Sequence, residues 1–162
     1  MYTAEDWIRH LDLLPHPEGG FYKEVHRTLE KTNELPDRFD GPRSFSTSIY
    51  YLLRSGDRSV FHRIKSDELW HHYDGSSLTI YVLETGGLRT HKLGKSIEKG
   101  ELPQLIIPAN HWFAARVEHT ASFVLAGCTV SPGFDFRDFE MAAKEDLLNE
   151  YPAEAKIISE LT

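Results

Sequence analysis

A histidine and a carboxylate stand close together in residues 56–75, within a predicted pair of short strands. The segment reads GDRSVFHRIKSDELWHHYDG and places His62 on one strand and Glu68 on the next. An imidazole and a carboxylate that face one cavity can exchange protons with a bound molecule or contribute ligands to a metal ion. This segment is therefore the first candidate for a functional site.

The predicted strands must bring these side chains to one face of the fold. Side chains alternate between the two faces of a strand, and His62 shares its face with two apolar neighbours, so this face is expected to point inward. Glu68 and His72 share one face of the next strand, and we expect both to converge on the cavity beside His62. Trp70 and Phe113 fall on the same inner faces and would form apolar walls.

Further ligand-binding candidates lie on the two strands predicted before this segment. Tyr22 and Glu24 share one face of the first strand, and we expect them to line the mouth of the cavity. Ser46, Ser48 and Tyr50 share one face of the second strand and would donate hydrogen bonds to a ligand. The alternatives are that Glu24 belongs to a solvated edge strand and that the serines face solvent or a partner sheet.

Many short strands between turns occupy the middle of the chain, which predicts an all-β sandwich or barrel. The predicted strands cover residues 21–27, 44–53, 59–65, 69–73, 78–84, 88–93, 104–108, 111–117 and 121–130. We expect one domain over residues 1–162. Its parts would be an N-terminal helix over about 3–14, a β-barrel over about 20–131, and C-terminal helices over about 137–161.

The composition disfavours several classes of partner. The 162 residues include 18 basic and 25 acidic side chains, and a net charge of −7 argues against binding to nucleic acid or to an anionic membrane. A single cysteine, Cys128, excludes an intrachain disulfide. No apolar stretch has the length of a membrane helix, and the N-terminal residues lack the features of a signal peptide. We expect a cytoplasmic protein.

Two segments resemble the conserved motifs of the cupins. Residues 56–75 match the first motif, G-x5-H-x-H-x3,4-E-x6-G, at every fixed position except the second histidine, where Ile64 stands. Residues 108–113 resemble the second motif, P-x-G-x2-H. There Asn110 replaces the glycine, which is tolerable because asparagine accepts a left-handed turn, and Phe113 replaces the histidine.

Longer segments resemble one cupin subfamily of unassigned function. They are PHPEGGFY (15–22), STSIYYLL (46–53), DELWHH (67–72), PANHWFAA (108–115) and GCTVSPGFDF (127–136). The resemblance covers nearly the whole chain. It implies a double-stranded β-helix, or jelly roll, with short terminal helices. It implies no particular activity.

A cupin metal centre uses three histidines and one glutamate, and the matching positions here keep only His62 and Glu68. Ile64 and Phe113 replace the other two ligands. His72 would supply a third ligand from the same predicted face, so the candidate metal set is His62, Glu68 and His72. Because two ligands hold a divalent ion weakly, we predict no cofactor and keep a divalent metal as the alternative.

Acid–base chemistry without a metal is the preferred interpretation. Glu68 would orient His62 and stabilise its protonated form, while burial tunes the pKa values of both groups. The resemblance extends to metal-free cupins that epimerise deoxysugar nucleotides with a histidine base. By analogy we favour proton abstraction next to a carbonyl, as an epimerase, isomerase or lyase acting on a carbonyl or sugar-like substrate would perform it. Two alternatives stay open: a non-catalytic module that binds a small ligand, and a metal-dependent cupin enzyme with a reduced ligand set.

Self-association is also expected from the predicted fold. A jelly roll of this size leaves edge strands that must be covered or paired, and the resemblance usually implies a dimer. We expect a homodimer, or a higher homo-oligomer built from dimers, with the N-terminal helix and first strand packed across the two-fold axis. The expected partner besides this second copy is a small-molecule ligand.

Overall fold

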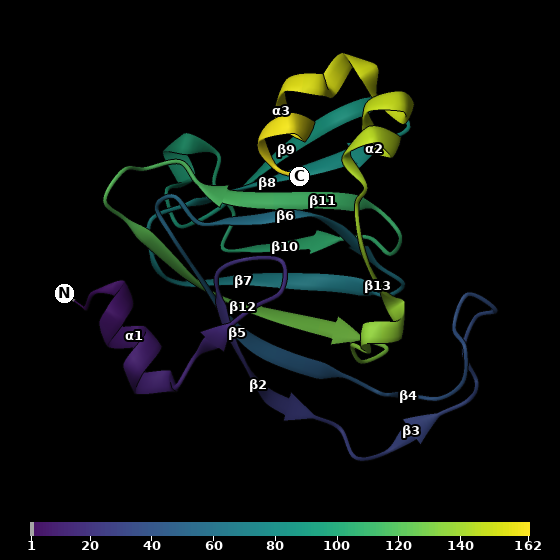
Figure 1. The fold of residues 1–162 in the computed structure, drawn as a ribbon. Helices are drawn as coiled ribbons and strands as arrows, with labels where there is room; N and C mark the ends of the chain where they lie inside the picture. Colours follow the sequence, from purple (N-terminus) through teal and green to yellow (C-terminus); the bar gives the residue numbers. More distant parts are fainter. Residues whose placement is uncertain (1) are drawn as a thin grey trace.

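Two antiparallel sheets face each other and enclose the interior of the molecule (Figure 1). The computed structural model describes residues 2–162. The six-stranded sheet has the strand order β1-β2-β5-β12-β7-β10, and the five-stranded sheet has the order β13-β6-β11-β8-β9. A short ribbon of β3 and β4 stands beside them. The all-β jelly roll predicted from the sequence is confirmed.

The strands of the larger sheet are β1 (Leu14–Pro15), β2 (Phe21–Arg27), β5 (Thr47–Arg54), β7 (Asp67–Gly75), β10 (Gln104–Ile107) and β12 (Phe123–Ser131). Those of the smaller sheet are β6 (Arg58–Ile64), β8 (Leu78–Glu84), β9 (Gly87–Leu93), β11 (Trp112–Val117) and β13 (Phe139–Met141). The ribbon pairs β3 (Lys31–Thr32) with β4 (Arg43–Ser44). The strands predicted over 21–27 and 78–84 coincide with β2 and β8, and the others differ by one to three residues at their ends.

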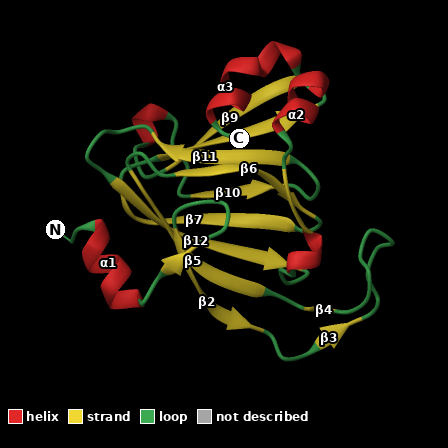
Figure 2. Ribbon diagram, viewed as in Figure 1, coloured by secondary structure: helices red, strands yellow, loops and turns green. Residues whose placement is uncertain are grey.

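Helices cover only part of the outside (Figure 2). The α2 helix (Lys144–Glu150) and the α3 helix (Ala155–Glu160) lie on the outer face of the five-stranded sheet, and the α1 helix (Ala4–Leu11) packs beside the six-stranded sheet. No helix within residues 2–162 combines the length and the apolar character needed to cross a membrane.

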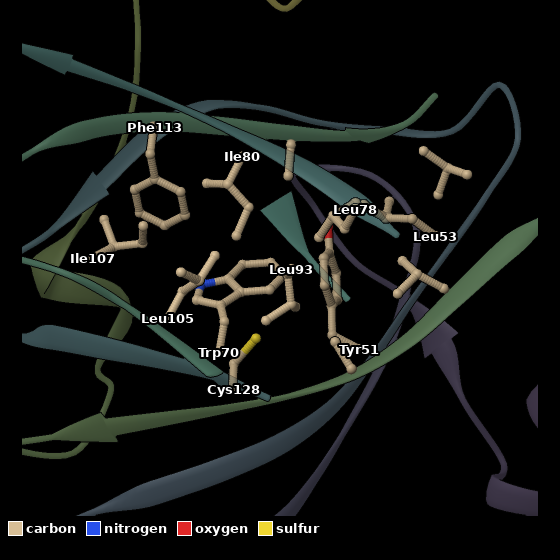
Figure 3. Packing of buried hydrophobic residues seen from close by; sticks show 14 of the residues in the cluster. Tyr51, Leu53, Trp70, Leu78, Ile80, Leu93, Leu105, Ile107, Phe113 and Cys128 are labelled. Atoms are coloured by element: carbon tan, nitrogen blue, oxygen red, sulfur yellow. The ribbon is translucent and has the colours of Figure 1, made fainter. Parts of the chain in front are cut away.

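The main core fills the space between the two sheets (Figure 3). Trp70 and Phe113 meet there edge to face, with ring centroids 6.3 Å apart. Because α2 and α3 cover the five-stranded sheet from outside, β8 is buried on both faces. Ile80 contributes to the main core, whereas Tyr81 packs under the C-terminal helices. This double burial explains why β8 lacks the alternation of apolar and polar residues and is mostly apolar.

Both terminal helices are shorter than predicted. Thr3 caps α1 through a reciprocal pair of hydrogen bonds with Asp6, but the helix ends at Leu11 and Asp12 adopts a left-handed conformation. Leu14 precedes a proline, which disfavours the helical conformation, and it pairs with β2 instead. The predicted C-terminal helical region of 137–161 starts in a single 3-10 turn (Phe136–Asp138) and continues as the strand β13, and its first α-helix begins only at residue 144.

A buried salt bridge holds the segment before β13 in place. The guanidinium of Arg43 donates from Nε and Nη2 to the two carboxylate oxygens of Asp138, at 2.6 and 2.7 Å. Both side chains are almost fully buried. This pair anchors residues 134–139 to the rest of the fold, and β13 then pairs with β6 so that Met141 stands opposite His62.

A tight turn at residues 16–20 carries the chain from β1 to β2 and packs against β6. Gly19 has a φ of +113°, and a Cβ atom there would lie 2.0 Å from the carbonyl oxygen of Arg58. The Gly19 carbonyl accepts a hydrogen bond of 2.7 Å from the Tyr51 hydroxyl. The amide of Val60 donates to the carbonyl of Glu18 at 3.1 Å. Only glycine permits this close approach, which turns the Glu18 side chain inward.

Gly19→Ala should therefore lower the free energy of unfolding by more than the strain of placing an alanine in a left-handed conformation, because the added Cβ also meets the Arg58 carbonyl. The matched control is Gly56→Ala, since Gly56 has a φ of +91° but no atom within 4 Å of the added Cβ. We expect Gly56→Ala to lower the free energy of unfolding by about 1–2 kcal/mol, and Gly19→Ala by about 3 kcal/mol or more. Urea denaturation measures both, and equal losses would contradict the close contact.

Candidate functional site

One end of the space between the sheets opens as a cavity of about 360 Å³. Its walls come from the 16–20 turn, from β2, β5, β6, β7 and β12, and from residues 134–139. Tyr51, Trp70 and Cys128, which Figure 3 shows among the packed side chains of the core, also belong to its lining. The cavity thus joins the centre of the barrel to the outside.

A buried carboxyl group, that of Glu18, organises the floor of this cavity. Its side chain is only 7% exposed. The Ser59 hydroxyl donates to Glu18 Oε1 at 2.8 Å, and His62 Nε2 lies 3.0 Å from Glu18 Oε2. Both partners come from β6, the strand on which the 16–20 turn rests.

The hydrogen bonds of His62 determine how many protons the Glu18–His62 pair holds. Nδ1 of His62 lies 2.8 Å from the carbonyl oxygen of Val60, which can only accept, so Nδ1 carries a hydrogen. One further proton must then lie between His62 Nε2 and Glu18 Oε2, because two facing lone pairs would repel. The pair is consequently uncharged as a whole, either as imidazolium and carboxylate or as two neutral groups.

His16 faces the same carboxyl from the other side. Its Nδ1 accepts a hydrogen bond of 3.2 Å from the amide of Glu18 and lies 3.8 Å from Glu18 Oε2. Burial lowers the pKa of His16, the Glu18 charge partly offsets this, and His62 lowers it further. His16 is therefore a neutral imidazole whose hydrogen sits on Nε2. Its ring packs edge to face on Tyr22, with centroids 4.5 Å apart.

Glu68 is the second buried carboxyl group of the cavity and is 8% exposed. Burial, and then the negative charge of Glu18, raises its pKa to about 8. The nearby Cys128 thiol and Trp70 indole oppose this shift. At neutral pH most Glu68 side chains are therefore protonated and can donate a hydrogen bond or a proton. The cavity holds one neutral carboxylic acid and one carboxyl group already paired with a histidine.

Aromatic rings form most of the remaining wall. Phe134, Phe136 and Phe139 pack edge to face around the mouth, with centroids 5.0 to 6.1 Å apart. Phe139 also lies against His62, at 5.5 Å between ring centroids. On the inner side, burial and the Glu18 charge raise the pKa of Tyr51 well above its usual value, so its hydroxyl stays neutral. Flat molecules are the natural occupants of such a cavity.

Paired charges surround the mouth. Arg27 donates from Nε and Nη2 to the two oxygens of Glu24, at 2.8 and 2.6 Å, and from Nη1 to the carbonyl of Phe134 at 3.0 Å. The carboxylate of Asp135 accepts from Arg137, which holds the pKa of Asp135 well below its usual value. Each arginine is thus matched by its own carboxylate.

Five of the residues predicted from the sequence line the cavity: His62, Glu68, Tyr22, Glu24 and Trp70. Phe113 lies behind His62, with ring centroids 4.1 Å apart, and supports that ring rather than lining the cavity. The expected orientation of His62 by Glu68 needs correction, because Glu18 supplies the carboxylate that contacts the imidazole.

His72 does not join this group, contrary to our expectation. It shares the inner face of β7 with Glu68 and Trp70, and all three side chains are buried. Four residues along a strand span about 13 Å, however, and the bulky Trp70 lies between Glu68 and His72. His72 Nε2 instead contacts the carbonyl of Ser76, at 3.0 Å.

Ser46, Ser48 and Tyr50 also lie outside the cavity lining, because the opposite face of β5 points inward. Thr47, Ile49 and Tyr51 line the cavity instead. The pairing of β2 with β5 explains the correction, since Tyr22 stands opposite Tyr51 and Glu24 opposite Ile49. Residues directly opposite each other project to the same side of a sheet.

Glu18 and His16 are functional candidates that reasoning from strand faces did not select. Both sit in a turn, where alternation gives no orientation. The available signal was the combination of a histidine and a glutamate within the Pro- and Gly-rich segment PHPEGGFY, directly before a predicted strand. Conformationally restricted segments of this kind often carry binding residues.

The donor set does not fit a cupin metal centre. Both ring nitrogens of His62 are engaged, one with Val60 and one with Glu18. Ile64 and Phe113 occupy the positions of two further ligands, and neither offers a donor atom. Across the described residues, no three His, Cys, Asp or Glu side chains are grouped so that they could hold a metal ion.

Comparisons with known proteins show similarity to cupins over most of the chain. Residues 5–142 match the family described as Cupin superfamily (DUF985). An uncharacterized protein of Saccharomyces cerevisiae is 30% identical over 159 residues, covering 90% of this chain and 78% of the yeast protein.

Several solved structures are similar to this chain over nearly its full length. A hypothetical protein from Leishmania major is 33% identical, with a TM-score of 0.91 over 99% of both chains. Protein SO0799 from Shewanella oneidensis is 40% identical, with a TM-score of 0.89 over 100% of this chain and 98% of the other. Oxalate decarboxylase from Bacillus subtilis, 16% identical with a TM-score of 0.56 over 91% of this chain and 36% of its own, shares the fold only.

The protonation of Glu68 should make stability depend on pH. Its pKa is about 8 in the folded protein against 4.5 for an ordinary glutamate, so the folded state keeps a proton that the unfolded chain releases. Stability must then fall as the pH rises from 4.5 to 8, by up to about 1.4 kcal/mol per pH unit from this group. Glu68→Gln should remove that slope.

Urea denaturation of both proteins between pH 4.5 and 8.5 measures the effect. The control is Glu140→Gln, which makes the same chemical change at an exposed residue of β13 paired with Arg63. We expect the control to follow the wild-type slope and Glu68→Gln to gain relative stability steadily up to about pH 8. Parallel curves for all three proteins would show that Glu68 is ionised in the folded state.

Proposed function

This chain belongs to the cupin superfamily (DUF985). From the geometry of its cavity we propose that it is a metal-independent acid–base enzyme acting on a small carbonyl or sugar-like molecule. One observation carries the proposal. A protonated carboxylic acid, Glu68, and a hydrogen-bonded carboxyl–imidazole pair, Glu18 and His62, line the same cavity. Two carboxyl groups held in different protonation states are the arrangement that acid–base enzymes use.

The roles follow from these contacts. The acid is Glu68, whose hydrogen would bond to the carbonyl oxygen of the substrate. The base is Glu18, whose carboxylate Ser59 and His62 hold in position. When Glu18 removes the proton from the carbon beside the carbonyl, Glu68 protonates the oxygen and an enediol forms without free charge on the substrate. Return of the proton to the neighbouring carbon, with Glu68 taking back a hydroxyl proton, completes an isomerisation.

His62 acts here as a positioning residue and as the counter-charge of Glu18. Its ring is fixed from both sides, by Val60 through Nδ1 and by Phe113 through ring packing. This fixed orientation keeps the Glu18 carboxylate at the floor of the cavity. The aromatic wall would hold the flat part of the substrate against it.

Exchange of carbon-bound hydrogen with solvent tests the proposal without knowledge of the natural substrate. Dihydroxyacetone, D-xylulose and D-fructose are each incubated with the protein in D₂O, and deuterium at the carbon beside the carbonyl is followed by ¹H NMR. We expect exchange with at least one compound, and a loss of about hundredfold or more in Glu18→Gln and in Glu68→Gln. Glu140→Gln, outside the cavity, is the matched control.

Two outcomes would contradict the assignment. Exchange that survives both Glu18→Gln and Glu68→Gln would place the chemistry elsewhere. Binding of these compounds, seen as a change in the NMR signal of the Trp70 indole, without any exchange would favour the alternative function. In that alternative the same aromatic cavity holds a small ligand and does not convert it.

Self-association through the six-stranded sheet is a separate proposal. Tyr73 on β7 and Ile106 on β10 lie on the outer face of this sheet and are 45% and 57% exposed. Tyr50 packs edge to face on Tyr73, at 6.0 Å, so the exposed apolar surface extends over neighbouring strands. Apolar surface of this kind on a sheet near its edge favours association with a second copy.

Sedimentation analysis at micromolar concentration measures this association. We expect a dimer mass for the wild type and a shift toward monomer for Ile106→Lys, because a buried lysine would remain unpaired at the interface. The control is Leu29→Lys, which makes the same kind of change at a residue that is 92% exposed in the segment before β3. A monomer mass for the wild type would refute the proposal.

A further inference from the structure

We infer that the substrate of this cavity is uncharged and carries neither a phosphate nor a carboxylate group. The inference rests on the proposed function and narrows its substrate class. It depends on which partners already pair with the positively charged side chains around the cavity.

The cavity offers no free cation to an anionic group. Arg27 is the one lysine or arginine side chain in its lining, within the chain as described. Each of the three guanidinium nitrogens already makes a hydrogen bond, two of them to the Glu24 carboxylate, which balances the charge of Arg27, and one to the carbonyl of Phe134. Recognition of phosphate or carboxylate normally needs an unpaired guanidinium or ammonium group, and Arg27 would have to give up Glu24 to supply one.

The two histidines of the cavity, His16 and His62, do not supply a free positive charge in place of Arg27. His62 shares its proton with Glu18, so that pair has no net charge. His16 is buried and neutral, because desolvation disfavours its charged form. Ionisation of Glu68 would add a negative charge, never a positive one. Any anion entering the cavity would therefore meet carboxyl groups without a compensating cation.

The cavity offers hydrogen-bond donors and aromatic rings that suit an uncharged molecule. The neutral carboxyl of Glu68 can donate to a carbonyl oxygen. The indole N–H of Trp70 is buried next to Glu68 and makes no hydrogen bond of normal geometry among the described residues, so it is a second donor at the wall beside Glu68. The rings of Tyr22 and Phe139 suit the face of a flat or cyclic compound.

Two probes of equal shape and different charge test the inference directly. Benzamide is neutral and benzoate is its anionic counterpart. Binding is followed by the ¹H–¹⁵N signal of the Trp70 indole, which is assigned with Trp70→Phe. At low salt and pH 7 we expect benzamide to bind at least tenfold more tightly than benzoate. Benzoate binding as tightly as benzamide would overturn the inference, and so would a failure of both to shift the signal.

Release of Arg27 from its partner should reverse the preference. In Glu24→Gln the guanidinium loses its counter-charge, and we expect benzoate to bind at least threefold more tightly than to the wild type, while benzamide changes by less than twofold. The gain should shrink in 0.5 M NaCl. Glu140→Gln removes a carboxylate outside the cavity and should leave the affinity of both probes unchanged. An unaltered benzoate affinity in Glu24→Gln would show that Arg27 does not control anion entry.

These results stand apart from the deuterium-exchange assay. Tight benzoate binding together with exchange on a keto-sugar would reject the charge selection and keep the acid–base function. Exclusion of benzoate together with no exchange on any keto-sugar would keep the charge selection and reject catalysis.

Discussion

Glu18 stays in the interior only because two neighbours on one strand satisfy it. Burial of an unpaired carboxylate costs several kcal/mol, and here Ser59 and His62 supply the hydrogen bonds that offset this cost. The same strand receives the 16–20 turn through the bond from Val60 to the Glu18 carbonyl. The shape of the turn, the position of β6 and the proton content of the cavity are therefore linked.

The charge on Glu18 reaches beyond its own contacts. It adds to the effect of burial on Glu68 and keeps that group protonated at neutral pH. It also disfavours ionisation of Tyr51. A turn that lies outside the main strands thus sets the electrostatics of a cavity built largely from them. Loss of Glu18 would alter the protonation of several groups together.

Strand alternation predicted part of the site and failed where other constraints decide. It placed His62, Glu68 and Trp70 correctly, because a buried face leaves little freedom of register. It erred for Ser48 and its neighbours, since only the pairing with β2 shows which face of β5 points inward. Alternation also gives no distance along a strand, so the prediction placed His72 too close to Glu68 and His62. Asn110, at the glycine position of the second motif, adopts a left-handed conformation with a φ of +63°, which asparagine tolerates.

The floor and the rim of the cavity come from opposite ends of the chain. Glu18 precedes β2, while Phe134 and Phe139 follow β12, and these parts meet only through contacts that are distant in sequence. Closing such contacts costs loop entropy, and folds rich in them form slowly. A chain in which either segment is undocked has no complete cavity. Occupancy of the cavity therefore reports that the fold is complete, and a ligand stabilises that completed state alone.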